Sequence, residues 1–134
     1  MDTTTAETFV ADYLRALEVA DLRAVLALFD DSAVVHSPLY GDVAAREFYP
    51  RLFADTSSSR LALRTVLRGE DAGAPVIAFW FDFDWTLLDG TLAPFTVVDV
   101  ARLNREGKIA ELHIVYDTAP IRSLFDAATE RSGD

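Results

Sequence analysis

The sequence predicts an α+β domain, in which a cone-shaped, curved antiparallel (mixed) β-sheet wraps around N-terminal helices. Three observations support this class. Apolar residues recur with helical spacing through most of the first 54 positions. Apolar and polar residues alternate, as in strands, over much of positions 60–117. An Asp89-Gly90 pair separates two runs rich in aromatic and β-branched residues, which is typical of a β-hairpin. Helices gathered early and strands gathered late indicate that the helices cover one face of the sheet.

The helices are expected before residue 55. Thr4 and Glu7 have the spacing of a capping box, so the first helix should begin there and end near position 20. Asp21 is a good N-cap for a second, shorter helix. Gly41-Asp42 should cap a third helix, which Pro50 should kink or restart. The expected elements are helices over 4–20, 22–29 and 43–54 and a short strand over 32–37.

The remaining strands are expected after residue 59. Leu61 and Leu63 alternate with polar or small neighbours, which fits a half-exposed strand. Gly107 can supply the positive φ that a second hairpin turn needs. Pro120 can occupy the first turn of a terminal helix. The expected strands cover 60–68, 75–88, 91–103 and 109–117, with loops or turns over 55–59, 69–74 and 104–108.

The expected strand 75–88 has two contrasting faces. Strict alternation places four aromatic rings on one face, and a tryptophan and two carboxylates on the other. The aromatic face either packs on the helices, which puts the acidic face outside, or pairs with a second copy of the chain. In the second case two like charges would line the interior and raise one carboxyl pKa. The aromatic face carries Phe79, Phe81, Phe83 and Trp85, and the acidic face carries Trp80, Asp82 and Asp84.

Asp99 interrupts an otherwise apolar strand, since Val97, Val98 and Val100 surround it. A carboxylate that leaves water must find hydrogen-bond partners or stay protonated. Asp99 therefore either faces a sheltered pocket, on which the proposed site depends, or points outward and pairs with Arg102 or Lys108.

Composition limits the classes of partner. A chain of 134 residues fits one domain over 1–134, long enough to bury a core. The net charge of −10 disfavours nucleic acid and anionic membranes. Cysteine is absent, which excludes thiolate chemistry, and no apolar run approaches the length of a membrane span. The first residues lack the features of a signal peptide, so a cytoplasmic protein is expected.

The order and spacing of four segments resemble the nuclear transport factor 2-like superfamily, in its branch of ketosteroid isomerases and SnoaL-type polyketide cyclases. The resemblance covers about residues 8–125 and implies the cone-shaped fold described above. Because this fold hosts enzymes and plain binding modules, it indicates function only weakly. The segments are residues 13–22, 32–38, 97–103 and 107–117.

The resemblance to the isomerases implies roles for particular residues. Tyr13 matches the family's oxyanion tyrosine, and Asp99 matches its protonated aspartic acid, a group that is known to be kept neutral by an apolar site. The family's base position is occupied by Ser37, with His36 beside it. Because a serine hydroxyl cannot accept the proton at neutral pH, the isomerase mechanism does not transfer intact.

The resemblance also allows residues to be matched to two other activities of the fold. Epoxide hydrolases use an arginine and two aspartates; here Asp82 matches one aspartate, but Trp80 and Ile114 replace the other two groups, which disfavours that activity. For the polyketide cyclases, the acid and base are a carboxylate and a histidine near the end of the sheet. Asp82, Asp84, His113 and Asp117 are the counterparts that this resemblance offers.

Two hypotheses follow. The first is an isomerase-like or cyclase-like enzyme acting by acid/base chemistry on a hydrophobic, carbonyl-bearing small molecule; the second is a non-catalytic binder of a small apolar ligand, or a dimerisation module. No cofactor is expected. The two histidines lie far apart in sequence, so no metal site is expected either, and a homodimer is expected from the aromatic face. The predicted catalytic residues are Asp99, Tyr13, Asp82 and Asp84, and the predicted substrate-binding residues are His36, Ser37, Trp80 and Tyr116.

Overall fold

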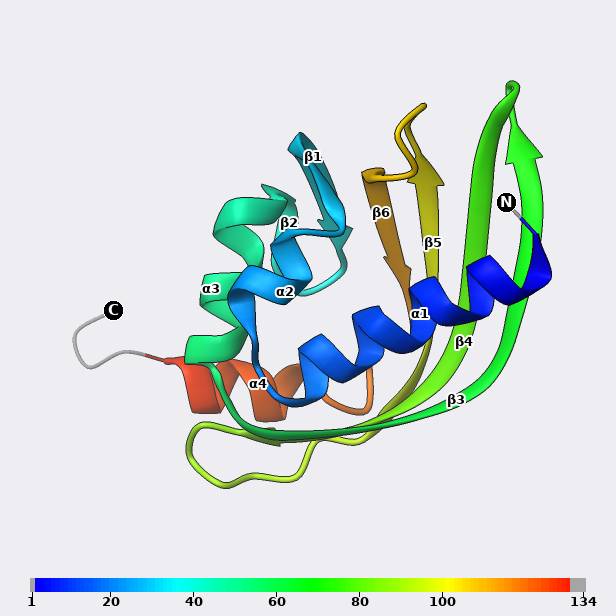
Figure 1. Cartoon of the computed structure of the whole chain (residues 1–134). Helices are drawn as coiled ribbons and strands as arrows, with labels where there is room; N and C mark the ends of the chain where they lie inside the picture. The colour runs from blue at the N-terminus through cyan, green and yellow to red at the C-terminus, as the bar shows by residue number, and fades with distance from the viewer. Residues whose placement is uncertain (1, 131–134) are drawn as a thin grey trace.

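A computed structural model describes residues 2–130 and has the predicted α+β architecture, in which helices lie along one side of a six-stranded curved sheet (Figure 1). The sheet does not close into a barrel. The elements in chain order are α1 (Thr3–Glu18), α2 (Leu22–Leu26), β1 (Phe29–Ser37), β2 (Gly41–Ala44), α3 (Ala45–Ala54), β3 (Thr56–Asp71), β4 (Ala74–Leu87), β5 (Phe95–Leu103), β6 (Ile109–Val115) and α4 (Arg122–Thr129).

The strand order in the sheet is β2-β1-β6-β5-β4-β3. Neighbouring strands are antiparallel except β1 and β6, which are parallel. The register of the long β3–β4 hairpin shifts between Leu63 and Thr65, and such irregularities let a strand bend. Helix α1 runs across the hollow of the curved sheet (Figure 1). The hollow side of the sheet therefore forms the interior of the molecule.

The orientation of β4 settles which of its two faces is inside. Phe79, Phe81, Phe83 and Trp85 are buried, whereas the side chains between them are partly or fully exposed. The aromatic residues pack in the core with residues of α1 and α3. The acidic face is therefore the outer one. The expectation that the aromatic face pairs with a second copy is wrong, because a single chain already buries these rings.

Element boundaries differ from the predicted ones where local signals compete. Asp2, not Thr4, caps α1, since its carboxylate accepts the backbone N–H of Thr5. The predicted cap Asp21 is confirmed, because its Oδ1 accepts the N–H of Ala24. Residues 41–44 form a strand that pairs with β1 rather than the first turn of α3. Pro50 lies inside α3, which continues on both sides of it.

The strands also differ from the predicted ones: β3 is longer than expected, whereas β5 and β6 are shorter. The expected loops over 55–59 and 69–74 belong mostly to β3, whose hairpin with β4 turns at Ala72 and Gly73, both with positive φ. Asp89-Gly90 lies in a connection over 88–94 rather than in a two-residue turn. Among the described residues, no helix is long and apolar enough to cross a membrane.

Candidate active site

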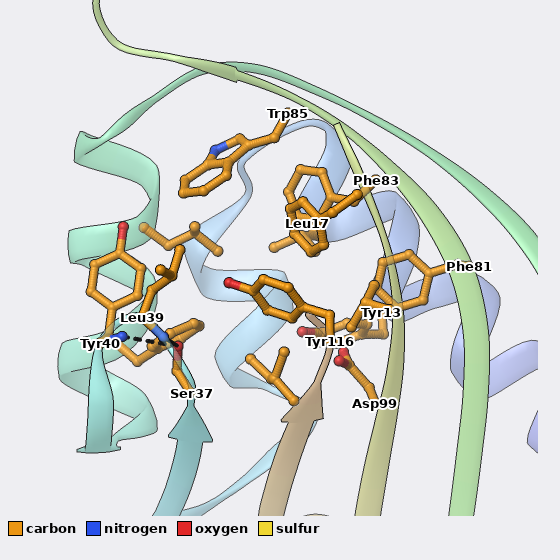
Figure 2. A pocket seen from close by; sticks show the side chains of 15 residues that line it. Tyr13, Leu17, Ser37, Leu39, Tyr40, Phe81, Phe83, Trp85, Asp99 and Tyr116 are labelled. Atoms are coloured by element: carbon orange, nitrogen blue, oxygen red, sulfur yellow. Dashed lines mark hydrogen bonds between the residues drawn. The ribbon is translucent and has the colours of Figure 1, made fainter. Parts of the chain in front are cut away.

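A cavity lies between the hollow face of the sheet and the helices (Figure 2). Its volume is about 40 Å³, which is room for a few water molecules. Most of its lining is aromatic or aliphatic. The lining residues are Tyr13, Leu17, Ser37, Leu39, Tyr40, Phe48, Leu52, Phe81, Phe83, Trp85, Phe95, Val97, Asp99, Ile114 and Tyr116.

Asp99 is the one carboxylic acid among these lining residues. It faces inward because its register partners are the buried Phe79 on β4 and Ile114 on β6. Its side chain is 2% exposed, and within the described part of the chain its Oδ1 has no hydrogen-bond partner. Burial raises the pKa of this carboxyl well above its ordinary value. Burial therefore favours the neutral acid, which can donate a hydrogen bond into the cavity.

Tyr13 reaches the same cavity from α1, as Figure 2 shows. Its hydroxyl lies 2.8 Å from the hydroxyl of Tyr49 on α3, and both side chains are buried. Burial, followed by the proximity of Tyr49 and Asp99, raises the pKa of Tyr13. Burial likewise raises the pKa of Tyr49. Both phenols are therefore neutral, and one of them donates to the other.

Ser37 lines the cavity at the end of β1, but its oxygen is already engaged. Its Oγ accepts the backbone N–H groups of Leu39 and Tyr40, at 3.2 and 3.1 Å. Because a hydroxyl oxygen has two lone pairs, Ser37 has only its own hydrogen left for a ligand. Ser37, which matches the position of the isomerases' base, can therefore offer a ligand only a hydrogen-bond donor.

Tyr116 follows β6 and lies at a half-buried edge of the cavity, where its ring stacks on Phe95 at 4.3 Å between centroids. Burial raises the pKa of its phenol. Leu39 and Tyr40 are also half-buried. These side chains form the rim that separates the cavity from solvent.

Three of the predicted site residues lie on the outer face of β4, away from the cavity. Asp82 accepts hydrogen bonds from Arg64 and Thr96, and the bond from Arg64 followed by that from Thr96 lowers its pKa. The guanidinium of Arg64 also lies 4.9 Å from the ring of Trp80. Asp84 is exposed. Asp82 or Asp84 could transfer protons in the cavity only if the acidic face of β4 lined it. That face points outward, so this condition is not met. The expected substrate contact of Trp80 fails for the same reason.

His36 also faces outward, because adjacent residues of a strand point to opposite sides and Ser37 faces inward. Its Nδ1 lies 2.9 Å from Asp42 Oδ1, and its Nε2 lies 2.9 Å from Glu111 Oε2. The hydrogen bonds to Asp42 and then Glu111 raise the pKa of His36. The expected role of His36 as a substrate contact is therefore not supported.

The structure brings the two histidines together, contrary to their separation in the sequence. His36 and His113 are register partners in the parallel β1–β6 pair, and their rings stack at 4.2 Å. Sequence spacing gave no sign of this contact, because parallel pairing joins segments 77 positions apart and leaves no local pattern.

One residue next to the cavity lining was not predicted from the sequence. Tyr49 on α3 is the hydrogen-bond partner of Tyr13. Its helical position signalled burial, but only the packing of α3 against α1 pairs the hydroxyls. The assembled site therefore combines the hydroxyl groups of Tyr13 and Ser37 with a carboxyl, Asp99, whose neutral form burial favours, in a largely apolar enclosure.

Comparison with known proteins agrees with this architecture. A family model described as a SnoaL-like domain matches residues 10–112. The Δ5-3-ketosteroid isomerase from Mycobacterium sp. is similar in structure, with a TM-score of 0.68, 17% identity, and coverage of 84% of this chain and 93% of the isomerase.

Two further solved structures are similar to the chain. SalBIII, an epoxide hydrolase/cyclase-like enzyme with a role in pyran ring formation in the polyether salinomycin, gives a TM-score of 0.72 at 22% identity, covering 89% of this chain and 95% of SalBIII. TerC, co-crystallised with polyporic acid, gives 0.73 at 17% identity, covering 90% of this chain and 98% of TerC. Because the sequence identities are this low, the structural similarity shows a common fold and nothing further.

Proposed function

Because this chain belongs to the SnoaL-like domain family, we propose that its cavity binds a neutral, hydrophobic, carbonyl-bearing molecule and promotes isomerase-like or cyclase-like chemistry on it. The observation that carries the proposal is the neutral Asp99 carboxyl, buried in an apolar enclosure that Tyr13 shares.

The proposed chemistry follows from the donors in the cavity. A carbonyl oxygen that accepts hydrogen bonds from Asp99 and Tyr13 becomes more electrophilic, and negative charge that develops on it is stabilised by preorganised donors. The low dielectric of the enclosure strengthens both interactions. The proton acceptor for such a reaction comes from the substrate itself or from water, because the lining side chains supply no base.

The charge state of the site also sets the class of ligand. An anionic ligand would lose its hydration without gaining a cationic partner, since no lysine or arginine of residues 2–130 lines the cavity. A flat, neutral ring with a carbonyl oxygen suits the aromatic walls formed by Phe81, Phe83 and Trp85. A ring-sized molecule exceeds the present volume, so the half-buried rim residues must move when it enters.

The test is a binding and turnover screen with cyclic ketones and aromatic quinones. Binding is followed by ligand-induced shifts in NMR spectra, and turnover by mass spectrometry. Asp99→Leu should weaken binding of a ketone about tenfold, the value of one lost hydrogen bond of about 1.4 kcal/mol. Asp84→Asn, on the outer face, is the matched control. Equal binding by both variants would contradict a role for Asp99.

A second candidate function is binding without turnover. It is favoured by Ser37, whose oxygen is occupied by two backbone N–H groups and cannot serve as a base. The same screen separates the two: a ketone that binds with Asp99-dependent affinity but is recovered unchanged supports a carrier or sensor domain.

We also propose that two copies of the chain pair through the outer face of the sheet. The register aligns Trp80 with Val98 and Val98 with Val115, which gives an apolar row across three strands. Leu67 lies beside it, and its side chain, like those of Trp80 and Val115, is exposed. Burying such a row against a second copy would remove it from water. Val98→Lys should shift the sedimentation profile from dimer to monomer, and a wild-type chain that sediments as a monomer would contradict the proposal.

A further inference from the structure

On the outer face, side chains of the types that bind metal ions form a row across three strands. Asp42 on β2 is the register partner of His36 on β1, and His36 is the register partner of His113 on β6. Glu111 precedes His113 by two residues and therefore points to the same side of β6. The backbone pairing alone thus places four such side chains next to one another, and the row is separate from the cavity.

The surrounding contacts orient these side chains. Asp42 Oδ1 lies 2.9 Å from His36 Nδ1, which leaves Nε2 of that ring facing Glu111. Arg102 donates to Glu111 Oε1 at 3.3 Å, which leaves Oε2 facing the histidines. Glu111 Oε2 lies 2.9 Å from His36 Nε2 and 3.9 Å from His113 Nε2. One ligand atom from each of the three residues lies within 4.8 Å of the others.

We propose that His36, His113 and Glu111 bind a divalent transition-metal ion, with zinc as the ion that their chemistry suits best. Two imidazoles and one carboxylate are a ligand set that zinc accepts, and a water molecule completes the tetrahedron. In this arrangement Asp42 accepts the Nδ1 hydrogen of His36 and fixes its tautomer, as carboxylates behind metal-bound histidines do.

The observed separations are close to those that a metal needs. Ligand atoms about 2.0–2.2 Å from a tetrahedral zinc ion lie about 3.3–3.5 Å from one another, between the two distances to Glu111 Oε2. The histidine rings are stacked with 12° between their planes, and a ligand nitrogen of each lies within 4.8 Å of the other. Turning the His113 ring, whose side chain is 50% exposed, would make the two nitrogens converge on one ion. The ion would replace the proton of the hydrogen bond between His36 and Glu111.

The site would tie β1 to β6 across the parallel pair. Because an ion that binds only the folded chain stabilises it by mass action, metal binding should also raise the unfolding temperature. Metal binding through histidine is easy to assign in this protein, because the sequence has two histidines and both lie in the cluster.

The test uses the untagged chain after dialysis against a chelator. Calorimetric titration with ZnCl₂ gives stoichiometry and affinity, and the visible spectrum of added Co²⁺ reports tetrahedral coordination. One ion per chain is expected. His113→Ala and Glu111→Gln should each weaken binding by at least tenfold, and Asp42→Asn by about tenfold because it removes the positioning contact. Circular dichroism confirms that each variant is folded.

Two control variants sharpen the result. Asp84→Asn, an exposed carboxylate outside the cluster, should bind zinc as the wild type does. Val98→Lys, which breaks the proposed contact between copies, should also keep full affinity because all ligands come from one chain. No saturable binding at millimolar zinc, binding that survives His113→Ala, or loss of binding in Val98→Lys would each overturn the proposal.

Discussion

An aspartate side chain has opposite surroundings on the two faces of the sheet. Asp99 on β5 points inward, has an unpartnered Oδ1, and burial raises its pKa. Asp82 on β4 points outward, accepts hydrogen bonds from Arg64 and Thr96, and these bonds lower its pKa. Burial thus favours the neutral form of Asp99, and hydrogen bonds favour the charged form of Asp82. Strand parity, which decides the face, therefore decides the chemistry.

The aromatic residues of β4 show the same contrast and give the largest expected effect. Phe81 is 2% exposed, whereas its neighbour Trp80 is 41% exposed. Phe81→Ala should lower the free energy of unfolding by about 3–5 kcal/mol, because it removes a core ring and leaves a cavity. Trp80→Ala should cost about 1 kcal/mol through loss of the contact with Arg64. Urea unfolding measures both, and equal losses would contradict the assigned faces.

The pH dependence of the wild-type free energy of unfolding should reflect the ionisation of Asp99. Because folding raises the pKa of this carboxyl, both states bind the proton at low pH, and the unfolded chain releases it first as the pH rises. Wild-type stability should therefore fall relative to Asp99→Asn by up to about 1.4 kcal/mol per pH unit, from about pH 4 to the folded pKa. Unfolding in urea between pH 4 and 8 measures the difference. A difference independent of pH would show that Asp99 ionises alike in both states.

The pair of buried phenols offers a smaller effect. Tyr13→Phe leaves the hydroxyl of Tyr49 buried without its partner, which should cost about 1–3 kcal/mol. The double variant Tyr13→Phe with Tyr49→Phe should cost less than the sum of the single variants, because no orphaned hydroxyl remains. A double-mutant cycle from thermal or urea unfolding measures the coupling. Strict additivity would mean that the two hydroxyls do not interact in solution.

The smallest effect is expected on the outer face. Asp82→Asn removes an exposed ion pair with Arg64, and exposed pairs contribute little to stability. The sign should be opposite to that of Asp99: folding lowers the pKa of Asp82, so its contribution is present above about pH 4 and is lost as the pH falls through the folded pKa. A stability difference that grew toward acid pH would contradict the pairing with Arg64.

The sequence allowed Asp99 and Tyr13 to be predicted at the cavity, but not every residue around it. Asp99 could be predicted because a carboxyl among valines is costly unless the fold shelters it. Tyr13 followed from the family resemblance, and it lines the same cavity as Asp99. The face of β4 could not be chosen from alternation, since alternation defines two faces and not which one the helices cover.

Contacts set by distant pairing were beyond the reach of local patterns. The Tyr13–Tyr49 bond joins two helices, and the His36–His113 stack depends on a parallel register between β1 and β6. Residues 41–44 read as a helix start because Gly41-Asp42 resembles a cap, yet pairing with β1 extends them as a strand. Tertiary pairing overrode a weak local preference there.

The most direct test of the account is a pH titration of the Asp99 carboxyl carbon by NMR, assigned with Asp99→Asn. We expect a pKa well above the ordinary value of about 3.9, because the carboxyl is shielded from water in the cavity that Tyr13 also lines. A pKa at or below that value would show an ionised, solvated group and would contradict the neutral donor on which the proposed function rests.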